Sequence, residues 1–224
     1  MQIRFTVETK SNLLIGGNES GFEIGGIDMH TVVDHDGYPY IPGSSFKGAF
    51  RKIIRDDNNK SINTIFAAYK RKIFERATTK AQELDFKIDI EDFKKNIEKG
   101  VEVDSEYMFG INSYNQSPKL MFSDLYLVEE SESKEKDFFS IDNKNTIGND
   151  LIANPRTYKS LRKGLKFMGI IRFRNFNELG LEAHAVIEYV KQKLPEFNNG
   201  VYRLGNSKSR GYGHIEVKVC EEND

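Results

Sequence analysis

Carboxylates and imidazoles crowd the stretch between positions 19 and 36, and these side chains are the best suited to chemistry. The set comprises Glu19, Glu23, Asp28, His30, Asp34, His35 and Asp36. Carboxylates without thiols suit a hard cation such as Mg²⁺, which usually keeps several of its waters. His30 follows Asp28 by two residues, and its imidazole makes it a candidate acid or base. A solvated turn is the plain alternative, and we assign Asp34-His35-Asp36-Gly37 to a turn on its composition.

A helix that begins after Pro42 is a candidate for binding phosphate. Ser44 and Ser45 offer hydroxyl groups at its start, where backbone N–H groups have no partner inside the helix. Its cations recur every four residues and therefore share one face: Lys47, Arg51 and Arg55. A helix start followed by a row of cations suits a phosphodiester backbone. An amphipathic helix with a solvated basic edge is the alternative, since Phe46, Phe50 and Ile54 form a neighbouring apolar face that can dock on a core.

A second phosphate-binding candidate lies near the C-terminus. Its sequence is Arg203-Leu204-Gly205-Asn206-Ser207-Lys208-Ser209-Arg210-Gly211-Tyr212-Gly213. Glycines let backbone amides approach an anion closely, and successive amides form a concave nest. The Gly-Lys-Ser/Thr ending of a P-loop is missing, and an alternating apolar strand follows at 214–220. A glycine-rich turn between two elements is the alternative.

These motifs together resemble the RAMP superfamily (repeat-associated mysterious proteins) of CRISPR–Cas effector complexes, in particular the repeating backbone subunit of type III-A, or Csm, complexes. Further matching stretches are Leu14-Ile15-Gly16-Gly17, Ile24-Gly25-Gly26-Ile27-Asp28, Tyr40-Ile41-Pro42-Gly43-Ser44-Ser45-Phe46-Lys47-Gly48, Tyr107-Met108-Phe109-Gly110, Leu120-Met121-Phe122-Ser123-Asp124 and Asn154-Pro155-Arg156. The order and spacing of the motifs carry the resemblance. Residues 60–105 match nothing that we can name.

The resemblance implies a subunit that binds guide RNA, stacks in several copies with other subunits of a type III effector complex, and cuts complementary target RNA. Asp28 matches the aspartate that the family requires for cutting, so the resemblance implies a catalytic residue there and a ligand for Mg²⁺ or another divalent cation. The residues expected to contact guide RNA are Ser44, Ser45, Lys47, Arg51, Arg156, Lys208, Ser209 and Arg210. Cleavage through the ribose 2′-hydroxyl would spare a DNA target.

Two positions depart from the family pattern. Leu14 stands where the family often has a histidine, so any contact from that histidine is absent. Asn206 replaces the second of two glycines that usually open the glycine-rich loop. Because asparagine tolerates left-handed backbone better than most residues, we expect the loop shape to survive.

Three other functions stay open at this point. The chain could be a non-catalytic guide-RNA-binding subunit, in which Asp28 is only a loop residue. It could be a guide-processing ribonuclease of the same superfamily, although a convincing histidine-centred site is missing. A sugar- or nucleotide-binding α/β protein is the most distant reading. Cleavage assays with and without EDTA separate the first two from the metal-dependent nuclease.

The motifs require a scaffold, and the chain order predicts an α+β fold, an elaborated ferredoxin-like (RRM-like) domain over residues 1–224. Strands are expected near 2–9, 119–128, 165–174 and 214–220, and helices over 44–57 and 179–194. The second helix is expected to turn Leu181, Ala185, Val190 and Leu194 inward. A helical insertion is expected at 58–106, with Ile65, Ala68, Tyr69, Ile73 and Phe74 at helical spacing. The resemblance places a thumb-like β-hairpin at 129–165, reaching over guide RNA.

Composition sets the outer bounds. The 224 residues carry a net charge of −1, which argues against a protein that coats DNA freely. The charges are polarised, since residues 151–177 are basic without an acid and residues 83–106 are rich in Asp and Glu. Such polarity suits head-to-tail stacking of identical subunits. No apolar run is long enough for a membrane span, and the single cysteine, Cys220, leaves a reducing cytoplasm as the simplest setting.

Overall fold

The computed structural model describes residues 1–16, 29–83, 89–111, 117–128, 138–147, 153–176 and 183–220. The chain forms two units, which we treat one at a time. The first unit comprises Met1–Ile3, Phe50–Met121 and Ile171–Lys193, and the second comprises Arg4–Ala49, Phe122–Ile170 and Leu194–Asp224. In the described part of the chain, no helix is long and apolar enough to cross a membrane.

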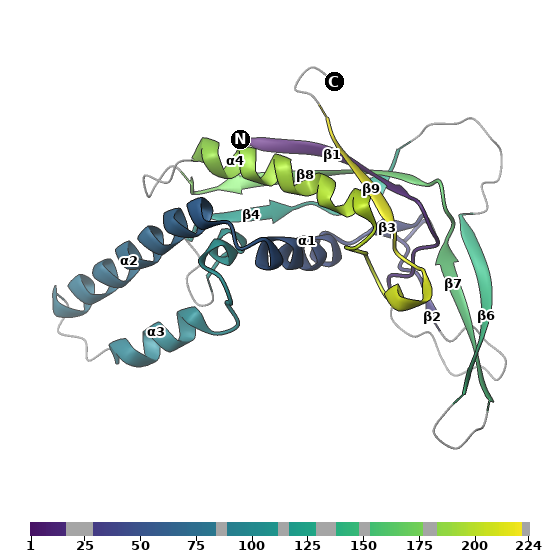
Figure 1. The fold of residues 1–224 in the computed structure, drawn as a ribbon, viewed down its shortest axis with the longest axis horizontal. Coiled ribbons are helices and arrows are strands. Elements are labelled where there is room, and N and C mark those ends of the chain that lie inside the picture. The colour runs from purple at the N-terminus through teal and green to yellow at the C-terminus, as the bar shows by residue number, and fades with distance from the viewer. Residues whose placement is uncertain are drawn as a thin grey trace. The chain divides into compact units, whose positions relative to one another are not determined.

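The main sheet is built around the N-terminal strand. β1 (Gln2–Thr9) alternates as predicted and buries Ile3, Phe5 and Val7. The strand order is β3 (Tyr40–Ile41), β5 (Leu125–Leu127), β8 (Lys166–Arg174), β1 and β9 (Ile215–Val219), and β4 (Lys119–Phe122) also pairs with β8. β9 runs antiparallel to β1, so the first and last strands along the chain lie side by side in this sheet (Figure 1).

Helix α1 (Gly43–Asp57) follows the predicted bounds and packs through aromatic rings. In the second unit the ring of Phe46 stacks on Phe5 at 4.9 Å between centroids and contacts Phe122 and Phe197. The predicted apolar face is therefore confirmed, since Phe46, Phe50 and Ile54 are all fully buried.

The helical insertion contains α2 (Lys60–Glu83), α3 (Ile90–Glu98) and the 3₁₀ helix η1 (Asp104–Phe109). The stripe of α2 that is buried comprises Ile62, Phe66, Tyr69 and Ile73. Of the apolar residues that the sequence places at helical spacing, Tyr69 and Ile73 are buried, whereas Ile65, Ala68 and Phe74 are half-buried or exposed. The difference arises because η1 packs along α2 and buries three consecutive apolar residues of its own, and a pattern search cannot locate that partner.

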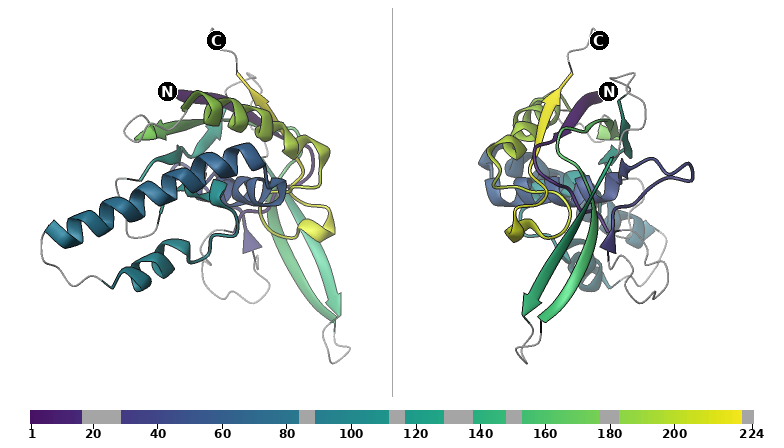
Figure 2. Two further views of the ribbon diagram at one scale, coloured as in Figure 1. Left: turned by 60° about the vertical axis from the view of Figure 1, so that its left-hand side comes forward. Right: turned by 90° about the vertical axis from the view of Figure 1, so that its right-hand side faces the viewer.

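A long antiparallel ribbon falls within 129–165, where the sequence predicts a hairpin. β6 (Phe139–Ile147) pairs with β7 (Ala153–Leu161) over nine residues, from Phe139 opposite Leu161 to Ile147 opposite Ala153. β2 (Met29–His30) adds a parallel strand to β7. Figure 2 shows the ribbon twisting away from the main sheet of the second unit.

Helix α4 (Ala183–Lys193) and the 3₁₀ helices η3 (Leu194–Asn199) and η4 (Lys208–Arg210) complete the chain. α4 buries Val186, Tyr189 and Val190, whereas Ala185, expected inside, is half-buried. The mixture of helices and a mainly antiparallel sheet confirms the α+β class. The finer ferredoxin-like assignment stays a prediction.

Candidate nucleic-acid interface

The glycine-rich loop rests directly on the segment that follows β1. The Asn206 amide donates to the Leu14 carbonyl at 2.7 Å, and the Gly213 amide donates to the Asn12 carbonyl at 2.8 Å. Both Gly205 and Gly213 have positive φ, and a Cβ on either would overlap a carbonyl oxygen, that of Leu14 or Leu204 respectively. Glycine is therefore required at these two positions by both conformation and space.

The loop turns at a residue that the sequence did not indicate. Ser207, with φ of 55°, adopts the left-handed conformation, whereas Asn206 does not. The left-handed residue is therefore the one after Asn206, and the backbone N–H of Asn206 is held by its hydrogen bond to the Leu14 carbonyl. That the loop keeps the shape typical of the family stays a prediction. Lys208, Ser209 and Arg210, three predicted contacts, follow as the exposed turn η4. The Arg210 guanidinium donates to the Tyr158 hydroxyl at 3.2 Å.

A group of polar side chains joins the base of the ribbon to this loop. The Asp142 carboxylate on β6 accepts hydrogen bonds from the Tyr212 hydroxyl at 2.5 Å, the Asn12 amide at 3.1 Å and the Ser160 hydroxyl at 3.3 Å. We call Asn12, Asp142, Tyr158, Ser160 and Tyr212 the Asp142 cluster. Burial and the bond to Asp142 raise the pKa of Tyr212, so its phenol remains a neutral donor.

The same place receives the chain that follows the candidate catalytic residue. Met29 packs against the buried residues Leu14, Tyr158 and Tyr212, and its backbone lies opposite Tyr158 in β7. Asp28 precedes Met29 but lies outside the described residues, as do Glu19 and Glu23. Within the described ranges, no group of three or more His, Cys, Asp or Glu side chains could hold a metal ion. A metal site at Asp28 therefore stays a prediction.

Asp34 and its neighbours form the turn that their composition predicts. The Asp34 carboxylate accepts hydrogen bonds from the backbone amides of Asp36 and Tyr38 at 3.0 and 2.9 Å. His35 lies 3.2 Å from the Asp36 carboxylate, and both side chains are exposed. His30, half-buried, lies opposite Lys159 at the edge of the ribbon. The turn accounts for Asp34 without catalysis.

The start of α1 differs from the expectation of unpartnered amides. The Gly43 amide donates to the Asp124 carboxylate at 2.8 Å, and the Ser45 amide donates to the Pro42 carbonyl at 3.0 Å. A carboxylate therefore already lies at this positive end of the helix. Ser44 is exposed beside it, and Ser45 is half-buried. Asp124 was missed because it lies 81 residues from Gly43 along the chain.

The cations farther along α1 have an internal acceptor in the first unit. Arg51 Nε lies 2.5 Å from Glu106, and Arg55 Nη2 lies 2.7 Å from it. Arg51 also donates to the Gly100 carbonyl at 3.1 Å. We call Arg51, Arg55 and Glu106 the Glu106 cluster. Burial opposes ionisation of Glu106, but hydrogen bonds from Arg55, the Glu102 amide and Arg51 outweigh it and lower its pKa to about 2.

The structure also describes two further residues that were predicted to contact guide RNA. Lys47 is half-buried on α1, and the backbone of Arg156 lies in β7 opposite Lys144. The role of Arg51 in binding RNA stays a prediction, although its guanidinium already has protein partners. Of the turn formed by Lys208, Ser209 and Arg210, Arg210 contacts the base of the ribbon through the Tyr158 hydroxyl.

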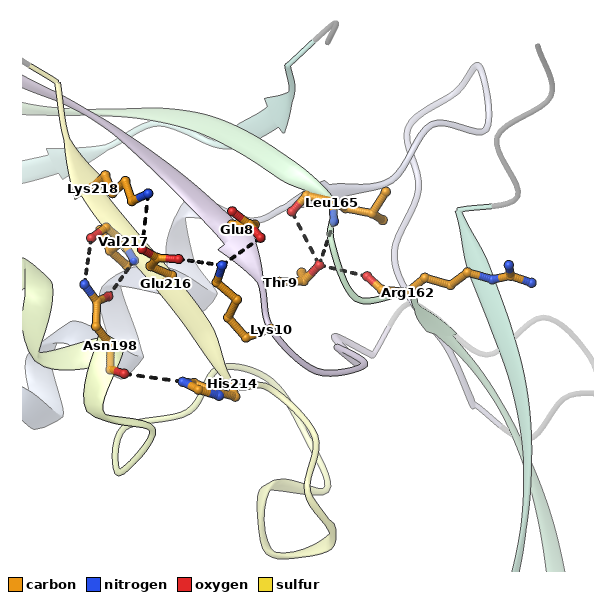
Figure 3. A network of polar contacts seen from close by, with 10 residues as sticks. All are labelled: Glu8, Thr9, Lys10, Arg162, Leu165, Asn198, His214, Glu216, Val217 and Lys218. Carbon is orange, nitrogen blue, oxygen red and sulfur yellow. Dashed lines mark hydrogen bonds and ion pairs between the residues drawn. The ribbon is translucent and has the colours of Figure 1, made fainter. Parts of the chain in front are cut away.

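A network of charged and polar contacts links the end of β1 to β9 and to the segment between β7 and β8 (Figure 3). Glu8 lies opposite Glu216 on the paired strands β1 and β9, and Lys10 reaches both carboxylates, at 2.7 and 2.5 Å. The Thr9 hydroxyl accepts the Leu165 amide and donates to the Arg162 carbonyl. These contacts fix the end of β1, from which Asn12 and Leu14 lead into the Asp142 cluster.

Comparison with known proteins gives one family. The profile of the RAMP superfamily matches residues 6–216. The chain is 27% identical over 218 residues to the CRISPR system Cms endoribonuclease Csm3 of Methanocaldococcus jannaschii, covering 95% of this chain and 76% of that protein.

Solved structures share the fold. A chain of the type III-B Cmr-beta complex bound to cognate target RNA superposes with a TM-score of 0.56 at 17% identity, over 98% of this chain and 60% of that one. A chain of a type IV-B CRISPR complex gives 0.55 at 13% identity, over 100% and 92%. The family match spans almost the whole chain and includes the loop and ribbon that form the candidate interface. The chain therefore belongs to the RAMP superfamily.

Proposed function

We propose that this protein is a backbone subunit of a type III CRISPR effector complex, which binds guide RNA and cleaves complementary target RNA. Several copies stack along one guide beside other subunits of the complex. One observation carries the proposal: the cationic turn 208–210, the base of the ribbon and the chain leading from Asp28 meet at the Asp142 cluster. The relative in Methanocaldococcus jannaschii is itself named an endoribonuclease.

Binding rests on the exposed turn. Lys208 and Arg210 carry positive charge, and Ser209 offers a hydroxyl group between them. Such side chains position a phosphate backbone without reading its sequence, and base pairing between guide and target supplies specificity. Ser44, Ser45 and Lys47 would supply the second contact, with Asp124 restricting how closely a phosphate approaches the Gly43 amide.

Cleavage rests on Asp28. The ribose 2′-hydroxyl gives up its proton to water as its oxygen attacks the adjacent phosphorus, and the bond from phosphorus to the 5′-oxygen of the next nucleotide breaks. The products are a 2′,3′-cyclic phosphate and a 5′-hydroxyl, whose oxygen takes up a proton as it leaves. Asp28 would orient the 2′-hydroxyl or hold a divalent cation such as Mg²⁺, which would offset charge on the phosphate. Met29, the residue after Asp28 in the chain, packs against Leu14, Tyr158 and Tyr212.

The test uses the complex reconstituted with guide RNA. Wild type and Asp28→Ala are compared on labelled complementary RNA, with Mg²⁺ and with EDTA. We expect regularly spaced cuts that need Mg²⁺ and disappear in Asp28→Ala while guide binding is kept. Asp36→Ala is the matched control, because it removes an exposed carboxylate from the neighbouring turn and should cut normally.

Each other outcome has a clear meaning. Normal cutting by Asp28→Ala would show that the site assignment is wrong. Tight guide and target binding without cuts in the wild type would indicate a purely structural subunit. A target with a single 2′-deoxy residue at the cut position should resist cleavage at that position only, and a cut there would exclude attack by the 2′-hydroxyl.

A further inference from the structure

Asp142 lies where three separate segments of the second unit converge. Its Oδ2 atom accepts from Tyr212 of the glycine-rich loop, Asn12 after β1 and Ser160 of β7. Its Oδ1 atom accepts a longer bond from Ser140, at 3.4 Å. One carboxylate oxygen therefore ties the base of the ribbon to two neighbouring loops.

The register shows which face of the ribbon is fastened. Asp142 lies opposite Tyr158, and Ser140 lies opposite Ser160, so these four side chains share one face. Ile141, which lies opposite Lys159 on the other face, is 65% exposed. The ribbon is thus held from one side at its base.

The loop side of the contact is equally constrained. Tyr212 is only 4% exposed and precedes Gly213, whose amide is bonded to the Asn12 carbonyl. Tyr158, on the same ribbon face, accepts from Arg210. The ribbon and the glycine-rich loop are therefore joined by two hydroxyl contacts, from Tyr212 to Asp142 and from Arg210 to Tyr158.

We infer that Asp142 is a positioning residue, which sets the direction of the ribbon relative to the glycine-rich loop through its Oδ2 atom. This inference rests on the proposed function, in which ribbon and loop hold the same RNA. The three donors to Oδ2, a phenol, an amide and a hydroxyl, are all neutral. The position of the acceptor oxygen therefore matters more here than the charge of the carboxylate. An asparagine whose oxygen takes the Oδ2 position keeps all three bonds, whereas alanine keeps none.

The first arm of the test needs no RNA. Hydrogen exchange is measured on wild type, Asp142→Ala, Asp142→Asn and Tyr212→Phe, with Tyr126→Phe as an exposed tyrosine control. We expect exchange to rise about tenfold in Asp142→Ala at the base of β6 and β7 and in residues 204–213, with β1 and β9 unchanged. Tyr212→Phe should give a smaller rise in the same two places, and Asp142→Asn should match the wild type.

The second arm uses the complex reconstituted with guide RNA. In Asp142→Ala we expect guide RNA to remain bound while cuts in the target lose their regular spacing, and Asp142→Asn should restore it. Unchanged exchange in both Asp142→Ala and Tyr212→Phe overturns the inference, and so does looser exchange with normal cut spacing. If Asp142→Ala does not fold, Tyr212→Phe decides both arms. A wild type that neither binds guide nor cuts target refutes the proposed function, while the exchange arm still decides whether Asp142 fastens the ribbon.

Discussion

Two carboxylates, Glu106 in the first unit and Asp142 in the second, each gather several segments of chain, but their donors differ. Glu106 is fully buried and receives two guanidinium groups, with bonds to both carboxylate oxygens. Asp142 is half-buried and receives three neutral donors at Oδ2, with a longer bond from Ser140 at Oδ1. The first arrangement depends on charge, and the second depends on the position of one acceptor atom.

The difference indicates that Glu106 stabilises the first unit, whereas Asp142 orients neighbouring segments within the second unit. A buried charge requires opposite charges, because removing one partner leaves the other unsolvated. Losing a hydrogen bond from a neutral donor costs less free energy than losing one from a charged donor. Such bonds therefore fix the orientation of the groups that they join and contribute less to the free energy of unfolding. The Glu106 cluster therefore suits the attachment of η1 to α1, and the Asp142 cluster suits alignment of the candidate interface.

Replacing Glu106 by glutamine should have the largest effect. Glutamine keeps one acceptor but places an amide donor against a guanidinium, so unfolding free energy should fall by about 4 kcal/mol. Chemical denaturation measures the loss. Glu102→Gln is the matched control, because Glu102 pairs with Arg55 but is 64% exposed, and it should cost less than about 1 kcal/mol. Equal costs for Glu106→Gln and Asp142→Asn would remove the distinction between the two clusters.

Substitutions of two nearby glycines test the loop that carries Tyr212. Gly213→Ala should cost about 3 kcal/mol, because φ is +80° and the new Cβ would overlap the Leu204 carbonyl. Gly211→Ala has a similar φ of +93° with nothing within 4 Å, so it should cost only about 1 kcal/mol. Thermal unfolding compares the pair. Equal shifts would show that conformation alone, and not the close packing on Leu204, decides the loop.

The stability that Glu106 contributes should depend on pH, because its pKa differs between the folded and unfolded states. Because its folded pKa, about 2, lies below the unfolded value near 4.5, the ionised form contributes stability that is complete above about pH 4.5. That contribution is lost as pH falls from about 4.5 through 2. The unfolding free energies of wild type and Glu106→Gln should therefore converge over this window. A constant difference down to pH 2.5 would contradict the role given to the Arg51 and Arg55 bonds.

The smallest expected effect is that of Lys208→Ala in the second unit, which we compare with Arg51→Ala in the first. Lys208→Ala should leave stability within about 0.5 kcal/mol and reduce the salt dependence of guide binding by roughly 0.7 in log–log slope. Arg51→Ala should instead lower the unfolding free energy by about 2 kcal/mol, because it removes a charged bond to Glu106. Filter binding at several salt concentrations gives both slopes. A reduced slope for Arg51→Ala as well would support its predicted phosphate contact.

Much of the scaffold could be predicted because it depends on local patterns. Alternation predicted β1 and β9, and apolar spacing with Pro42 and Gly43 predicted α1. The buried face of α2 was predicted only in part, since its partner η1 begins at Asp104, twenty-one residues after α2 ends at Glu83. The prediction for the start of α1 was wrong in one respect. The Gly43 amide is not unpartnered, because the Asp124 carboxylate reaches it from a distant part of the chain.

The candidate interface divides in the same way. The sequence by itself determined the chemistry: the types and order of Lys208, Ser209 and Arg210, the glycines around them, and the family motifs. Only the tertiary structure decided that Arg51 faces Glu106 and that Asp142 meets Tyr212, which is 70 residues away. The physical reason is that charge and backbone preference belong to each residue, whereas a hydrogen-bond partner is chosen by how strands and loops pack.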